Sequence, residues 1–587
     1  MNKDIENLIA NKQFRDAKTI ILEELKNNEN DLELLKNLGL CQVNLEDYPN
    51  AQKTFAQIIE QKSDDATAYF YSAFLNEKLK NKELAIVHYQ KVIELREHYI
   101  DAYKNLASLY IQEKMNEEAD KLLQKLYEFT KKENTDCTIP FLYANTQVLL
   151  NNTDKAIELL QEALTLNDKH IQSLNTLGCL YMAQSKYDES FELYQKSLNI
   201  DDKNATTHFN IGTWYMIKQN FKNAKEHFAL ACKYQETVQH LAQLGLAQMK
   251  DLDFPNACAT YQKLCTLLPV SLTFKFNYAL CLYETKQYTQ AISILLPIVQ
   301  QNPKSAVMAH KLALCFRELG QIKNSALIFE RILKLGKIPA EIYLDYANLL
   351  LLDNDTQHAE KILKKLLQIN PKLAQAHKDL GVIYLLQRLF EEAKECFDKA
   401  IELAPQNPYI VFEYANYYQA ISEFSEAEKY YEKANKLLPN QENICLMFGL
   451  NQIKLNKLEK AKEFLTQVLA INPQSLVALT NLAQISFANQ NFELAKEYLT
   501  DAYTIEANTN VTNLLAMTYM ELNDYHNAKV LLNRLNNEIP NNTNILTTLA
   551  KAEMLDNNPQ MAKSYLEQAI AIFPELEEAQ ELLQKLS

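Results

Sequence analysis

The chain contains 587 residues, of which 47% are hydrophobic, and carries a formal net charge of −14. A negative field repels phosphate backbones and anionic lipid headgroups, so this balance disfavours nucleic acids and membrane surfaces as partners. Eight glycines are too few for a β-rich, turn-rich fold. The composition therefore favours an all-helical protein.

The first ten residues lack the uninterrupted apolar stretch of a signal peptide. No later segment approaches the ~20 apolar residues of a membrane-spanning helix. We therefore expect a cytoplasmic protein without membrane insertion. The ten cysteines are scattered beside apolar residues and form no C-x-x-C pair, so we expect reduced thiols in the core.

A period of 34 residues organises the chain, as in the alanine series from Ala359 to Ala495 and the proline series from Pro371 to Pro473. A fixed period in this range is typical of solenoids, in which each repeat buries its apolar face against its neighbours. After a truncated first unit, the repeat windows begin at residues 32, 66, 100, 137, 171, 205, 238, 272, 306, 340, 374, 408, 442, 476, 509 and 543.

Two window positions carry small side chains. The eighth is Gly or Ala in all sixteen windows, and the twentieth is Ala except at Ser190 and Ser325. Small residues twelve positions apart lie on two helices joined by a short turn and allow the backbones to approach closely. Apolar residues recur around them at helical spacing, and a proline such as Pro405 follows the second helix. Each window therefore predicts a hairpin of two helices, here called A and B.

The chain resembles the tetratricopeptide repeat family, whose pattern is carried by segments such as Ala374–Gly381 and Glu391–Phe397. The resemblance covers essentially the whole chain. It implies an all-α solenoid, a right-handed superhelix of about 17 helical hairpins whose A helices line a concave groove. We expect residues 1–574 to form one continuous superhelix and residues 575–587 to form a capping helix.

One window departs from the period by more than one residue. The window that begins at residue 100 is 37 residues long, and the polar segment Lys131–Asp136 holds the excess. We interpret it as a longer turn, with a local docking loop or a bend in the superhelix as alternatives.

The sequence shows no recognisable catalytic constellation: no Gly-rich phosphate loop, H-E-x-x-H motif, paired His/Cys metal spacing or nucleophile elbow is present. We therefore predict no enzyme activity, catalytic residue, metal site or cofactor. His208 and His377 occupy the fourth window position, where a bulky aromatic residue commonly packs. His310 occupies the fifth position and could face the groove, although no partner spacing accompanies it.

If the A helices pack through positions 4, 7, 8 and 11, positions 2, 5, 6, 9, 12 and 13 point to the concave side. An extended peptide needs amide side chains for its backbone and apolar or soft surface for its side chains. One section of the groove offers both, and its candidate peptide-binding residues are Phe209, Asn210, Met216, Gln243, Met249, Phe276, Asn277 and Tyr283.

Asparagine also recurs at the sixth position, at Asn37, Asn105, Asn210, Asn277 and Asn481. This pattern resembles the asparagine ladder in the tetratricopeptide superhelix of O-linked N-acetylglucosamine transferase, which contacts the backbone of bound proteins. Only five of sixteen windows carry it and none of them are adjacent, so a continuous ladder is absent. The carboxylate clamp of other family members is also absent, which disfavours chaperone-tail binding.

Further along, the sixth position is acidic in three successive windows, at Asp345, Asp379 and Glu413. These carboxylates are candidates for binding a basic peptide segment. Ordinary solvation of an acidic face is the alternative, and Lys311 and Lys378 lie close enough to moderate the charge.

The sequence therefore predicts a non-catalytic scaffold that binds protein or peptide partners in its groove. One alternative is a substrate-recruiting accessory chain of an enzyme system such as protein glycosylation. Another is an assembly factor for secretion, pili or cell division, against which the expected cytoplasmic location weighs. Neither the partner nor the oligomeric state follows from the sequence.

Overall fold

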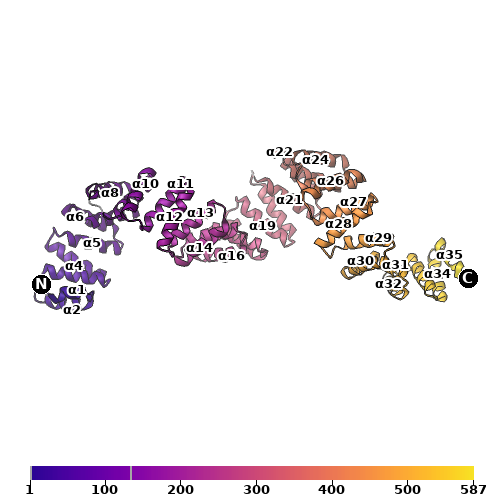
Figure 1. Cartoon of the computed structure of the whole chain (residues 1–587), viewed down its shortest axis with the longest axis horizontal. Helices are drawn as coiled ribbons and strands as arrows, with labels where there is room; N and C mark the ends of the chain where they lie inside the picture. Colours follow the sequence, from indigo (N-terminus) through magenta and orange to yellow (C-terminus); the bar gives the residue numbers. More distant parts are fainter. Residues whose placement is uncertain (1–2, 133–134, 337, 587) are drawn as a thin grey trace. The chain divides into compact units, whose positions relative to one another are not determined.

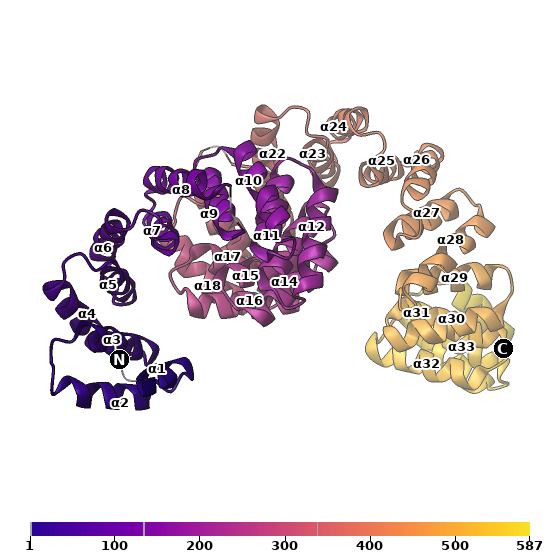
Figure 2. The same cartoon turned by 60° about the vertical axis from the view of Figure 1, so that its left-hand side comes forward.

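The computed structural model describes residues 3–132, 135–336 and 338–586, and within these ranges it contains helices and no strand (Figure 1). The chain divides into two compact units, residues 1–301 and residues 302–587. Each unit is an α-solenoid in which a helix packs against the helices before and after it. Figure 2 shows this succession for α25 to α28. The single continuous superhelix stays a prediction.

The helices of the first unit are α1 (Lys3–Ala10), α2 (Phe14–Leu25), α3 (Leu32–Asn44), α4 (Tyr48–Gln61), α5 (Ala66–Lys78), α6 (Lys82–Leu95), α7 (Ile100–Gln112), α8 (Asn116–Thr130), α9 (Thr138–Leu149), α10 (Thr153–Leu166), α11 (Ile171–Ala183), α12 (Tyr187–Ile200), α13 (Ala205–Ile217), α14 (Phe221–Tyr234), α15 (Val238–Lys250), α16 (Phe254–Leu267), α17 (Leu272–Glu284) and α18 (Tyr288–Gln301).

The helices of the second unit are α19 (Ala306–Glu318), α20 (Ile322–Leu333), α21 (Ala340–Leu352), α22 (Thr356–Ile369), α23 (Ala374–Leu386), α24 (Phe390–Leu403), α25 (Pro408–Ala420), α26 (Phe424–Leu437), α27 (Glu442–Lys454), α28 (Leu458–Ile471), α29 (Leu476–Ala488), α30 (Phe492–Ile505), α31 (Thr509–Glu521), α32 (Tyr525–Glu538), α33 (Thr543–Leu555), α34 (Pro559–Ile572) and α35 (Glu577–Leu586). From α3 onward, odd numbers are A helices and even numbers are B helices.

The two small-residue positions form the contact between helix A and helix B. A Cβ added at Gly178 would lie 2.5 Å from the ring of Tyr194, and one at Gly39 would lie 2.6 Å from the ring of Phe55. Both rings occupy the twenty-fourth window position. The two serines at position 20 fit because each hydroxyl finds an acceptor: Ser190 Oγ donates to the Gly178 carbonyl at 2.8 Å. Ser325 makes the same bond to Ala313, also at 2.8 Å.

Each hairpin turn places its fifteenth window residue in the left-handed region, and glycine fills that position only at Gly320 among the windows. Leu252 is the apolar example, with a φ of 58° and a side chain that is 72% exposed. The turn after α15 is closed by two bonds, from the Leu252 N–H to the Met249 carbonyl and from the Asp253 N–H to the Gln248 carbonyl.

Leu252→Asn is expected to stabilise the first unit by about 1 kcal/mol, because asparagine adopts the left-handed region at a lower energy than leucine does. The exposed leucine side chain gains little from burial, so its loss costs little. Urea unfolding followed by tryptophan fluorescence measures the change. Leu267→Asn is the control, since Leu267 is also exposed but lies in α16. An equal gain in both variants would contradict the explanation.

The end of the longer window is held by hydrogen bonds to Asp136. Asp136 accepts from Lys104 Nζ at 3.0 Å and from the backbone N–H of Thr138 at 2.9 Å. Residues 133 and 134 of the predicted insertion lie outside the described residues.

The cysteines are all free thiols. Six of them are buried, and burial raises the pKa of Cys281 and Cys315 to about 12. Cys179 is exposed on α11, so the expectation of a core thiol is wrong for this residue.

Candidate functional site

Positions 2, 5, 6, 9, 12 and 13 of consecutive A helices are predicted from the sequence to line the groove, and this face is here called the A-helix face. Its fifth and sixth positions meet between repeats. Asn210 Nδ2 donates to Asn175 Oδ1 at 3.3 Å, and His310 Nε2 lies 2.8 Å from Asp345 Oδ2. In both pairs the two residues are 35 positions apart in the sequence, which is one repeat period plus one residue. The A-helix face is therefore held together by side-chain bonds between neighbouring hairpins.

A pocket of about 440 Å³ opens on this face of the first unit, between α11 and α13. Its rim includes the two residues that cap these helices, His170 and Asn204. We call it the α11–α13 pocket, and it is lined by Phe141, Asn167, Lys169, His170, Ile171, Gln172, Asn175, Thr176, Asn204 and Thr206. The lining offers amides and hydroxyls, the phenyl ring of Phe141, the imidazole of His170 and one ammonium group.

A buried polar chain supports the wall of this pocket. Asn175 is 5% exposed and donates to Thr207 Oγ1 at 2.8 Å, while Ser197 Oγ lies 2.8 Å from the same hydroxyl. Asn210, 8% exposed, completes the chain through its bond to Asn175. Buried amides with satisfied bonds hold one orientation. The expectation that Asn210 faces an open groove is therefore wrong, and the structure makes it a positioning residue behind Asn175.

The apolar candidates are half-buried and belong to the packing of the first unit. The Phe209 ring lies edge-on to Phe228, with centroids 5.5 Å apart, and 5.2 Å from His240. Phe209 and Met216 pack against one core cluster and Met249 against the next. These side chains therefore keep only part of their surface exposed.

The remaining candidates of this section are half-buried. Asn277 Nδ2 donates to the hydroxyl of Tyr261 at 3.1 Å, and Tyr283 packs against Tyr288 with ring centroids 5.5 Å apart. Gln243 and Phe276 lie on the same face of α15 and α17. Peptide binding by these residues stays a prediction.

The three acidic candidates on the A-helix face of the second unit have partners within the chain. Asp345 pairs with His310 and lies 3.7 Å from Arg317. Asp379 is 4% exposed, and its carboxylate lies 2.5 Å from Lys378 Nζ. This burial contradicts the idea that Asp379 forms part of an open acidic stripe.

Glu413 is half-buried and accepts from Asn416 Nδ2 at 3.0 Å. The proposed stripe is thus reduced to Asp345 and Glu413. Sequence reasoning missed the partner of His310 because Asp345 stands one repeat away and is offset by one residue.

The histidines do not form a metal centre. No group of three or more His, Cys, Asp or Glu side chains in the described part of the chain is arranged to hold a metal ion. His208 packs in the interior as an aromatic residue and makes a hydrogen bond to His227, with the two Nδ1 atoms 3.1 Å apart.

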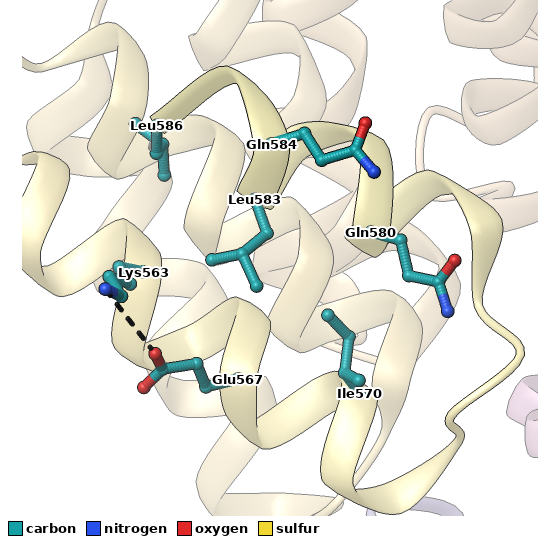
Figure 3. A pocket seen from close by; sticks show the side chains of 7 residues that line it. All are labelled: Lys563, Glu567, Ile570, Gln580, Leu583, Gln584 and Leu586. Carbon is teal, nitrogen blue, oxygen red and sulfur yellow. Dashed lines mark ion pairs between the residues drawn. The ribbon is translucent and has the colours of Figure 1, made fainter.

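A hollow of about 500 Å³ lies between α34 and α35 (Figure 3). Ile570 and Leu583 form its apolar floor, while Lys563 and Glu567, 3.9 Å apart, stand on one rim. In α35 the eighth repeat position is Gln584, where every earlier window has Gly or Ala. A long amide there takes the place of the small residue on which a B helix packs in the windows. The role of α35 as a capping helix stays a prediction.

Helical hairpins that meet through one small residue on each helix define an α-solenoid of repeated helix pairs. Tetratricopeptide repeat models match residues 67–96, 340–373, 374–407 and 452–518. The model for the TPR repeats of Integrator complex subunit 8 matches residues 144–259. The chain is a tetratricopeptide repeat protein.

Two curated relatives are similar to part of the chain. The chain is 22% identical over 362 residues to BBSome complex member BBS4 of Bos taurus, and the match covers 59% of this chain and 67% of the relative. It is 24% identical over 362 residues to BBSome complex member BBS4 of Mus musculus, covering 59% and 66%. The similarity thus spans about two thirds of the length of these relatives.

Among solved structures, the crystal structure of the APC/C hetero-tetramer Cut9-Hcn1 is 18% identical, with a TM-score of 0.35 and coverage of 84% of this chain and 96% of that chain. PilF of Pseudomonas aeruginosa is 18% identical, with a TM-score of 0.30 and coverage of 42% and 97%. Within the described residues, every helix is too short or too polar to span a bilayer.

Proposed function

We propose that this chain is a non-catalytic protein-interaction scaffold that binds an extended peptide segment along the A-helix face of its first unit. The observation that carries the proposal is the α11–α13 pocket, which opens on that face and is lined by amides, hydroxyls and an aromatic ring. The tetratricopeptide repeats support a role in protein binding. The curated relatives are named as members of a complex, which supports action within an assembly.

The chemistry of the pocket suits one side chain of an extended peptide. Amide and hydroxyl groups pair with polar atoms of such a segment, and the Phe141 ring offers apolar surface. Because the Asn175 amide is fixed by Thr207 and Asn210, little side-chain entropy is lost on binding. Beyond the pocket, the half-buried rings of Phe209 and Phe276 offer further apolar surface for neighbouring peptide residues.

Thr176→Arg tests the proposal by filling the pocket with a long charged side chain. We expect the recovery of partners that co-purify with the full chain to fall by about tenfold, which corresponds to about 1.4 kcal/mol of binding free energy. Crosslinking mass spectrometry of the wild type and of the Thr176→Arg variant measures whether the crosslinks between partners and residues near α11 and α13 disappear.

The matched control is Val87→Arg, because Val87 is 55% exposed on α6 of the same unit and outside the pocket. Unchanged recovery with Thr176→Arg, or an equal loss with both variants, would rule out the pocket as the binding site. Asn210→Ala is a poorer test because it disturbs the buried chain as well as the surface.

A further inference from the structure

The A-helix face of the second unit carries exposed leucines at the ends of two successive A helices. Helix α21 ends in Leu351 and Leu352, and α23 ends in Leu385 and Leu386. Leu352 is 67% exposed and Leu386 is 66% exposed. Leu351, Leu385 and Val382 of the same face are half-buried. We call these five residues the leucine patch.

The fold does not require large apolar side chains at the two exposed sites. Leu352 and Leu386 occupy the thirteenth window position, which in other windows of the second unit is Glu318, Ala420, Lys454, Ala488, Glu521 and Leu555. Charged and small residues are thus compatible with the same backbone. Exposed leucines thus stand at the same position of two successive repeats, and exposed apolar surface of this kind is a feature of interaction sites.

The electrostatic surroundings of the leucine patch favour a cation. Leu352 and Leu386 are the last residues of their helices, where the aligned peptide dipoles leave partial negative charge. Asp353 follows Leu352 at the end of α21 and is exposed. On the preceding A helix, α19, the Arg317 guanidinium is engaged by Glu318 at 2.7 Å and by Asp345 at 3.7 Å. Arg388, in the turn after α23, offsets part of the negative charge.

We propose that the leucine patch binds an amphipathic helical segment of a partner protein, with leucine-like side chains on one face and Lys or Arg beside them. A helix fits because its apolar side chains at i, i+3, i+4 and i+7 form a broad stripe that can cover projecting leucines. The flanking basic side chains face the helix ends and Asp353. This surface lies within the second unit and is independent of the α11–α13 pocket.

The test uses a fluorescent synthetic peptide with leucines at helical spacing and lysines on both flanks, titrated against the full chain by fluorescence anisotropy. Leu352→Ser combined with Leu386→Ser is expected to weaken binding by at least about tenfold. Replacing the lysines of the peptide by glutamates is expected to weaken binding by a similar factor. Both leucines are mainly exposed, so the variant should keep the wild-type unfolding curve.

Leu327→Ser is the matched control, because Leu327 is 62% exposed but lies on the B helix α20. Its binding curve should match that of the wild type. Unchanged affinity of the double variant, an equal loss in the control, or equal affinity for the acidic peptide would overturn the proposal. Thr176→Arg should not alter binding of this peptide, which keeps the outcome separate from that of the first unit.

Discussion

Gly178→Ala is expected to destabilise the first unit by about 1–2 kcal/mol, although alanine is the better helix former. An ideal Cβ at this site would lie 2.5 Å from Tyr194 Cε1, and Tyr194 is fully buried. Overpacking a core of this kind costs about 1–3 kcal/mol and sometimes more. The gain in helix propensity of about 1 kcal/mol offsets only part of that cost.

Tyr194→Leu is expected to relieve the clash in the Gly178→Ala background. Seven windows already pair alanine at position 8 with leucine at position 24, for example Ala107 with Leu123 and Ala144 with Leu160, all of them buried. Tyr194→Leu alone leaves a cavity and removes the hydroxyl that donates to Cys179 Sγ at 3.4 Å. The double variant should therefore be at least about 1 kcal/mol more stable than the sum of the single effects implies.

Urea unfolding followed by tryptophan fluorescence measures this coupling, because Trp214 is the only tryptophan and lies in the first unit. Gly245→Ala is the control, since its added Cβ would lie 3.0 Å from Tyr261, a milder contact. We expect a stability change near zero there. Additive effects at Gly178 and Tyr194 would show that the two residues do not share one packing constraint.

The solenoid could be predicted because its packing repeats in register. Positions 8 and 20 return every 34 residues, and a column of small residues has one simple explanation, the close approach of two helices. The A helices begin at the window starts except for α9, which begins at Thr138. The left-handed turn residues were not predictable from composition, because Lys12, Glu46 and Leu252 adopt that conformation without the usual glycine signal.

The candidate site was predicted less well because its contacts are offset from the period. Asn175 with Asn210, and His310 with Asp345, are separated by 35 residues, since position 5 of one A helix meets position 6 of the next. Aligning windows in register compares equivalent residues and does not show these neighbours. The same offset explains why Asn210 is a buried support while Asn175, which sequence reasoning passed over, lines the pocket.

A second contact that the period does not reveal joins two histidines inside the first unit. His208 Nε2 lies 2.9 Å from the Asp202 carbonyl and its Nδ1 lies 3.1 Å from His227 Nδ1. Since the carbonyl can only accept, the His208 proton belongs on Nε2, and His227 must donate from Nδ1. His227 also stacks on Tyr215, with ring centroids 5.6 Å apart.

Acid is therefore expected to destabilise the first unit. The pKa of His227 is lowered to about 4 from its usual 6.5, chiefly because the ring is buried and secondly because His208 lies beside it. The unfolded chain binds the proton more readily than the folded one. The contribution of neutral His227 to the free energy of unfolding is therefore fully present above about pH 6.5. It falls as the pH drops toward 4 and then levels off. At about 1.4 kcal/mol for each pKa unit, the loss reaches up to about 3 kcal/mol.

His227→Gln should remove most of this pH dependence, because a glutamine amide can still donate to His208 Nδ1 but does not titrate. Urea unfolding at about pH 7, 5.5 and 4.5, which spans the titration, compares the variant with the wild type by Trp214 fluorescence. His526→Gln is the control, since His526 is exposed and lies in the second unit. A His227→Gln protein that loses stability with falling pH as steeply as the wild type would place the acid sensitivity elsewhere. Other half-buried histidines whose pKa is also lowered by burial, His88 and His170, would then be its source.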